Sequence, residues 1–74
     1  MQDTTVQRLI TNIRAEMDRQ RLSQEKLGQL LSLSQPAVSR RLTGHVPFNV
    51  EELDLIASKL NLSLADLIEA GPAG

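Results

Sequence analysis

Apolar residues recur every three or four positions along most of the chain, a spacing that places them on one face of an α-helix. The first stripe predicts a helix over about residues 5–21, with Thr4 and Gln7 as a capping pair at its start. Its apolar positions are Val6, Leu9, Ile10, Ile13 and Met17. The alternation typical of a half-buried strand is almost absent, so the chain is expected to be all-α.

Start and stop residues predict a second and a third helix, each about two turns long. The second begins after Ser23 and ends at residues 32–34, with Leu27, Leu30 and Leu31 as its apolar positions. Pro36 falls in the first turn of the third helix, where a missing backbone N–H does no harm. That helix is expected to end near Leu42, because Gly44 is a favoured residue just beyond a helix.

Two further helices are predicted after a loop at residues 45–48. Asn49 and Glu52 form a capping pair for the fourth helix, whose apolar positions are Val50, Leu53, Ile56, Ala57 and Leu60. Ser63 and Asp66 start a fifth helix that carries Leu64, Leu67 and Ile68 and is expected to end at Gly71 and Pro72. With 74 residues, the chain has room for a single domain (1–74), ordered over about residues 4–70.

The composition excludes several kinds of site. There is no cysteine, and His45 is the only histidine, so neither a disulfide nor a zinc site is expected and no cofactor is implied. We expect His45 to be a loop residue without chemistry. No carboxylate pair, nucleophile–base set or Gly-rich phosphate loop marks an enzyme. The chain has neither an apolar run of about 18 residues nor a signal-peptide pattern, so we expect a cytoplasmic protein without a membrane partner.

Charge is distributed unevenly, although the net charge is only −1. Residues 1–44 carry a balance of +3 and residues 45–74 a balance of −4. Binding to a polyanion depends on the local field of the contacting face. The first part of the chain therefore suits DNA, while the second suits solvent or another protein.

The segment 23–44 has the features of a helix-turn-helix. Gly28 supplies a small residue where two helices would cross, and apolar residues flank the turn at Leu27, Leu31, Leu33 and Val38. With its Gln24 start and its Val-Ser-Arg…Gly ending, the segment resembles the phage-repressor and Cro-like (Xre-type) helix-turn-helix family, over roughly residues 5–70. The resemblance implies a five-helix lambda-repressor-like DNA-binding domain, with the helix-turn-helix at the second and third helices.

Two residues depart from the family pattern. The family usually has glycine in the turn where this chain has Ser32, so Ser32 is expected to adopt a left-handed conformation. The family usually has an apolar residue where Arg41 stands, so Leu42 is expected to take over the packing. The stem of arginine can also pack.

Helical geometry predicts which face of the third helix reads DNA. With Val38 toward the core, Leu42 lies about 40° away, and the face about 100–200° away holds small, polar or basic residues. Glutamine suits adenine and arginine suits guanine in a major groove. The residues expected to contact bases are Gln35, Pro36, Ala37, Ser39 and Arg40. The plainer interpretation is a solvated polar face on a surface helix.

Contacts to the DNA backbone are expected from the flanks of the reading helix, at Gln24, Arg41, Thr43 and Asn49. For Gln24 the resemblance implies such a contact. Helix capping is an equally good interpretation of Gln24 and Asn49. Packing against the rest of the domain is an equally good interpretation of Arg41.

The sequence thus predicts a transcriptional regulator that binds double-stranded DNA, and more specifically a repressor that occupies an operator. Proteins of this class usually bind two-fold sites as dimers, so a weak homodimer, or one completed on DNA, is expected. Two alternatives use a protein partner at the fourth and fifth helices. They are an antitoxin-type regulator and a protein-interaction module without a DNA role.

Overall fold

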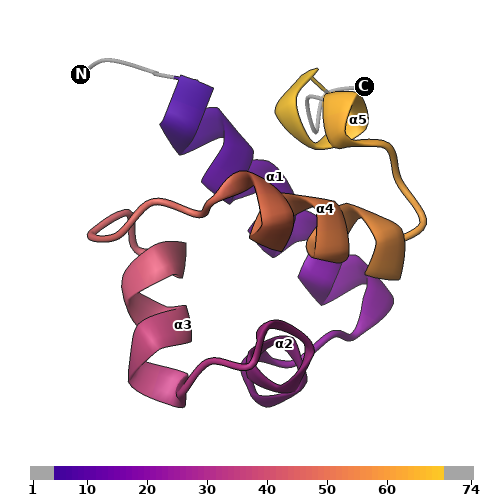
Figure 1. Cartoon of the computed structure of the whole chain (residues 1–74). Coiled ribbons are helices and arrows are strands. Elements are labelled where there is room, and N and C mark those ends of the chain that lie inside the picture. Colours follow the sequence, from indigo (N-terminus) through magenta and orange to yellow (C-terminus); the bar gives the residue numbers. More distant parts are fainter. Residues whose placement is uncertain (1–4, 70–74) are drawn as a thin grey trace.

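The computed structural model describes residues 5–69, which form five α-helices and no strand (Figure 1). The helices are α1 (Thr5–Gln20), α2 (Gln24–Leu31), α3 (Gln35–Leu42), α4 (Val50–Lys59) and α5 (Leu64–Glu69). The predicted all-α class and the order of the helices are confirmed. Thr4 of the first capping pair and the helix-ending residues 71–72 lie outside the described residues.

Side chains cap the start of four helices, because the first backbone N–H groups of a helix have no partner within it. Ser23 accepts from the backbone of Lys26 at 3.1 Å, and Ser34 accepts from the backbone of Ala37 at 3.3 Å. Reciprocal capping boxes start the last two helices: Asn49 with Glu52, and Ser63 with Asp66. The predicted starts at Ser23, Asn49 and Ser63 are confirmed.

The first four helices end in one and the same way. A residue with positive φ follows each helix, and the next residue donates its backbone N–H to a carbonyl five positions earlier, which is a Schellman motif. The positive-φ residues are Arg21 (61°), Ser32 (58°), Gly44 (87°) and Asn61 (62°). The left-handed conformation expected at Ser32 is confirmed. In three of the four motifs the next residue is a leucine, at Leu22, Leu33 and Leu62, and each packs on the core.

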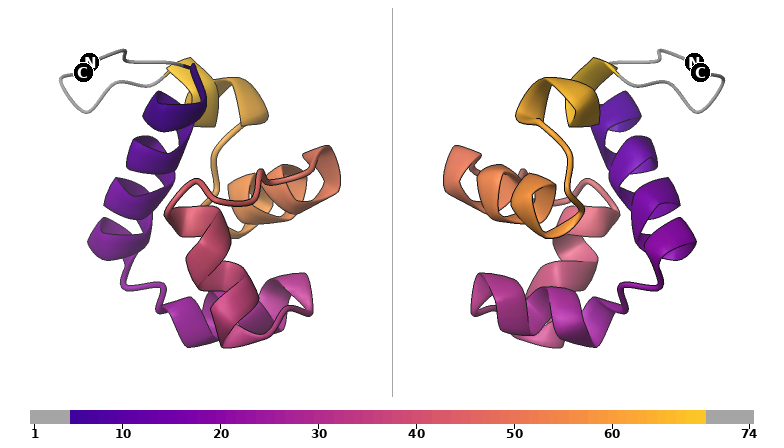
Figure 2. Two further views of the ribbon diagram at one scale, coloured as in Figure 1. Left: turned by 90° about the vertical axis from the view of Figure 1, so that its left-hand side faces the viewer. Right: turned by 90° about the vertical axis from the view of Figure 1, so that its right-hand side faces the viewer.

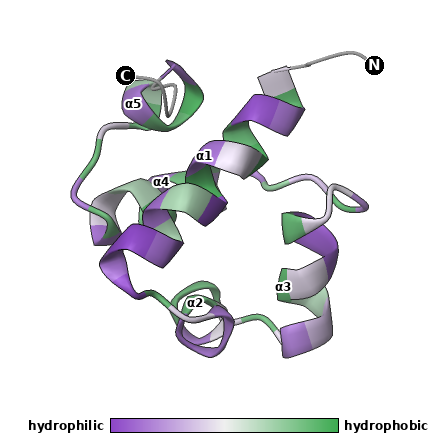
Figure 3. Cartoon of the chain, turned by 180° about the vertical axis from the view of Figure 1, so that it is seen from behind, coloured by the Kyte–Doolittle hydropathy of each residue, from purple (hydrophilic) through white to green (hydrophobic). Residues whose placement is uncertain are grey.

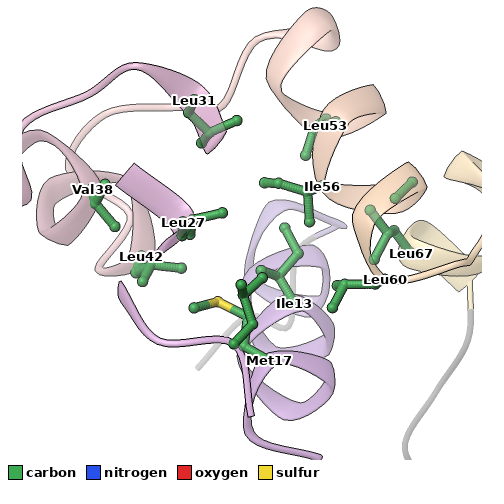
Figure 4. Close-up of a cluster of buried hydrophobic side chains, with 12 residues drawn as sticks. Ile13, Met17, Leu27, Leu31, Val38, Leu42, Leu53, Ile56, Leu60 and Leu67 are labelled. Carbon is green, nitrogen blue, oxygen red and sulfur yellow. The ribbon is translucent and has the colours of Figure 1, made fainter. Parts of the chain in front are cut away.

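One apolar cluster draws side chains from all five helices, and its members turn toward one another between the helices (Figure 4). Each helix carries both hydrophobic and hydrophilic residues (Figure 3), so one face of each is available to the cluster. The fully buried members are Ile13, Leu27, Val38, Ile56, Leu60 and Leu67. Two residues of the predicted apolar stripes lie outside the cluster, since Val6 is 52% and Val50 is 70% exposed. Both lie in the first turn of their helix.

Polar side chains of α1 bind three other helices. Asn12 donates to the carbonyl of Leu67 at 2.8 Å, and its side chain is buried. Two further α1 donors reach the ends of α3 and α4, Arg14 to Leu42 at 3.2 Å and Gln20 to Leu60 at 2.9 Å. The last carbonyls of a helix have no partner within it, so these bonds satisfy otherwise open acceptors. Figure 2 shows α1 along one flank of the molecule, with α5 beside its first turns.

Candidate nucleic-acid interface

The crossing of α2 and α3 depends on the absence of a side chain at Gly28. A Cβ atom built there would lie 2.9 Å from the carbonyl oxygen of Leu33 and 3.4 Å from Cγ2 of Val38. The first distance is too short for real contacts, so any larger residue would have to displace the backbone of the turn. The structure therefore confirms Gly28 as the small residue at the crossing, with α3 lying across α2 (Figure 2).

The two faces of α3 differ in burial as the helical geometry predicted. Val38 has no exposed surface and Leu42 is 3% exposed, so this face is anchored in the core. The burial of Leu42 fits the expectation that it packs on the core in place of the apolar residue that the family has at position 41. Residues of the other face are exposed, at Gln35, Pro36, Ser39, Arg40 and Thr43, and Ala37 is half-buried between the two faces.

Gln35 and Arg40 make no side-chain hydrogen bond or ion pair with any other residue in the range 5–69. Their amide and guanidinium donors are therefore open to an external acceptor. Gln24, half-buried at the start of α2, is likewise without a side-chain partner among the described residues. These three side chains lie at or beside the helix-turn-helix.

Thr43 is held by its own helix more firmly than the sequence suggested. Its Oγ1 lies 2.9 Å from the carbonyl of Ser39 and 3.2 Å from that of Arg40. A hydroxyl has one proton, and a carbonyl can only accept it. The third contact is 2.8 Å to Nδ1 of His45, and the tautomer of the ring sets its direction: Nδ1–H donates to Thr43, whereas a bare Nδ1 accepts from it. This contact of His45 was not predicted from the sequence. The only signal for it was the position of His45 directly after Gly44, where the chain turns back toward the end of α3.

Asn49 uses only half of its side chain as a helix cap. Its Oδ1 accepts from the backbone N–H of Glu52 at 2.7 Å, and its own N–H donates to Oε1 of Glu52 at 3.0 Å. The amide Nδ2 has no partner among residues 5–69, and Asn49 is exposed. Capping and an outward donor therefore coexist in this residue.

Arg41 turns toward α4 rather than standing free. Its Nε lies 3.0 Å from Oε1 of Glu52, and its Nη1 donates to the carbonyl of Ala37 at 3.1 Å. The side chains of Arg41 and Glu52 are only 17% and 10% exposed. Sequence reasoning identified Glu52 as a capping residue but missed the ion pair. Opposite charges on either side of a short loop were the only signal for it.

Within the described part of the chain, no group of three His, Cys, Asp or Glu side chains is arranged to hold a metal ion, and no helix is long and apolar enough to cross a membrane. A family model described as helix-turn-helix matches residues 13–67, which is most of the chain. No curated protein and no solved structure gives a match. On its family match and its five-helix fold, the chain belongs to the Xre/Cro/lambda-repressor-like helix-turn-helix family of DNA-binding regulators.

Proposed function

We propose that the chain is a sequence-specific transcriptional regulator that inserts α3 into the major groove of an operator and acts as a repressor by occupying it. One observation carries the proposal. The side of α3 opposite the buried Val38 and Leu42 is exposed, and its two longest polar side chains, Gln35 and Arg40, have no partner among the described residues. A groove-reading helix needs such open donors and acceptors.

The residue types on this face match the edges of bases in a major groove. The amide of Gln35 suits the paired donor and acceptor of adenine, and the fork of Arg40 suits the two acceptors of guanine. Pro36 and Ala37 offer apolar contact to a thymine methyl group, and the hydroxyl of Ser39 can bond either kind of edge.

Backbone contacts are proposed on both sides of α3. Gln24 lies at the start of α2, where the helix dipole also favours a phosphate. The open Nδ2 of Asn49 supports a second contact after α3. Thr43 is the third candidate and would have to share its hydroxyl proton with the end of its own helix. Such contacts set the position of a protein on DNA without reading sequence.

The test is selection from a random duplex library, with wild type and the double variant Gln35→Ala/Arg40→Ala run in parallel. Wild type is expected to enrich a two-fold motif, and the folded double variant is expected to lose it. A matched control is Arg8→Ala/Thr11→Ala, which removes two exposed side chains from α1. No enrichment by wild type at low salt would contradict the proposal.

A homodimer through α4 and α5 is proposed as the form that occupies a two-fold operator. Leu55 on α4 is 44% exposed and would be covered in such a dimer. Sedimentation with and without the selected duplex measures the stoichiometry. A monomer on a half-site would contradict the dimer. The same surface fits an antitoxin-type partner, and such a protein would co-purify with a bound partner.

A further inference from the structure

A series of hydrogen bonds between four polar groups connects α3 with the start of α4. The carbonyl of Ala37 accepts from Arg41 at 3.1 Å, and Arg41 pairs with Glu52 at 3.0 Å. The same Oε1 of Glu52 accepts the backbone N–H of Asn49, also at 3.0 Å. These hydrogen bonds therefore connect, without a gap, the first turn of the proposed reading helix to a residue proposed to contact a phosphate.

The charges in this series are largely removed from water and are well placed. The side chains of Arg41 and Glu52 are 17% and 10% exposed. Arg41 lies in the last turn of α3 and Glu52 in the first turn of α4, and each helix end favours the charge that it carries. Breaking such a pair by removing one partner leaves a desolvated charge without compensation.

The pair spans a loop that has no regular structure. Residues 43–49 connect α3 to α4, and α3 packs mainly on α2, with little direct approach to α4. A side-chain link across the loop therefore restricts how α3 and the start of α4 lie relative to each other.

We infer that Arg41 is a positioning residue and not a phosphate clamp: together with Glu52 it fixes the reading face of α3 relative to Asn49. The inference rests on the proposed function and deepens it. A protein reads a site well only when base contacts and phosphate contacts are satisfied in one register. Holding that register is the task assigned to the pair.

A phosphate clamp and a positioning pair predict different changes in DNA binding. Loss of a clamp weakens binding to every duplex equally and lowers the log–log salt slope by about 0.9 for the lost phosphate contact. Loss of a positioning pair lowers affinity for the selected duplex more than for a scrambled one. The ratio of the two affinities is therefore the decisive measurement, with the salt slope beside it.

The variant that tests the inference is Arg41→Met/Glu52→Met, measured on the selected duplex and on a scrambled duplex of equal length. Apolar replacement of a buried ion pair usually preserves folding. Arg41→Lys keeps the charge but lacks the rigid planar fork with which Arg41 bonds Glu52 and Ala37 at once. The matched control is Arg8→Met/Asp18→Met, which makes the same change in charge at two exposed positions of α1.

For the double variant we expect the affinity ratio to fall about tenfold, a typical coupling for residues in one network, with binding to the scrambled duplex and its salt slope unchanged. Arg41→Lys is expected to lower the ratio as well. An unchanged ratio in the double variant would overturn the inference. The single variant Arg41→Met is measured beside them. The inference would also be overturned if Arg41→Lys bound both duplexes as wild type does while Arg41→Met lost the same affinity on both. A wild type that selects no duplex at all would overturn the proposed function and the inference together.

Discussion

Among residues 5–69, three residues other than glycine adopt positive φ at helix ends, and Ser32 does so inside the turn of the helix-turn-helix. A side chain there has its Cβ close to the following carbonyl oxygen, whereas glycine has no such contact. Ser32→Gly is expected to raise the free energy of unfolding by about 0.5 kcal/mol, because relief of strain exceeds the extra freedom of the unfolded chain.

The opposite change at Gly44, where φ is 87°, provides the control for Ser32→Gly. Gly44→Ala is expected to lower the free energy of unfolding by about 1 kcal/mol. Urea unfolding of both variants measures the two effects. If both variants changed the free energy of unfolding equally and in the same direction, backbone strain at positive φ would not explain the effects at Ser32 and Gly44.

Gly28 has a steric role of a different kind. Its missing Cβ leaves room for the carbonyl oxygen of Leu33, which belongs to the backbone and cannot rotate away. Gly28→Ala is expected to cost about 1–3 kcal/mol as an overpacked position, despite the better helix propensity of alanine. Thermal unfolding measures the loss. Gln29→Ala, at the exposed neighbour, is expected to leave the melting temperature nearly unchanged.

At the scale of the helix, the core-facing side chains of α2 contribute strongly to the stability of the domain. Leu31 is 8% exposed and belongs to the shared cluster, so Leu31→Ala is expected to cost about 2–5 kcal/mol. Leu55→Ala removes the same atoms from a side chain that is 44% exposed and is expected to stay within about 0.5 kcal/mol. Similar melting temperatures for the two variants would mean that the core lies elsewhere.

The helices were predictable because the signals that start and end them are local. Ser23 and Asn49 bind backbone groups three residues away, so the sequence contains both partners of each bond. The exposure of Val6 and Val50 depends on which parts of the chain pack over the first turn of each helix, and no local pattern reports that.

In the candidate site, the exposed face of α3 followed from periodicity, since Val38 alone determines its orientation. The pair of Arg41 with Glu52 did not, because it depends on the path of the loop between them. The same is true of Thr43, whose hydroxyl is shared with His45 only after the chain turns back at the end of α3. DNA contact by any of these residues stays a prediction.

At the scale of the whole molecule, the bond from Asn12 to the carbonyl of Leu67 joins α1 to α5. Asn12→Ala is expected to cost about 1–3 kcal/mol, because it leaves a buried carbonyl without a donor. The backbone amides of α5 are expected to exchange with solvent faster, which hydrogen exchange resolves by segment. Thr11→Ala, at the exposed neighbour, is the control. Unchanged exchange in α5 would show that Leu67 alone anchors it.

The three bonds from α1 also have a consequence during synthesis. α1 is synthesised before the helices that it binds, so Asn12 meets its acceptor only after 55 more residues have been added. Arg14 and Gln20 wait for partners 28 and 40 residues further on. Until those residues are synthesised, the polar and apolar side chains of α1 that bind the later helices remain uncovered. During this time proteases and chaperones have access to this face of α1. A pause in translation before residue 67 prolongs that access.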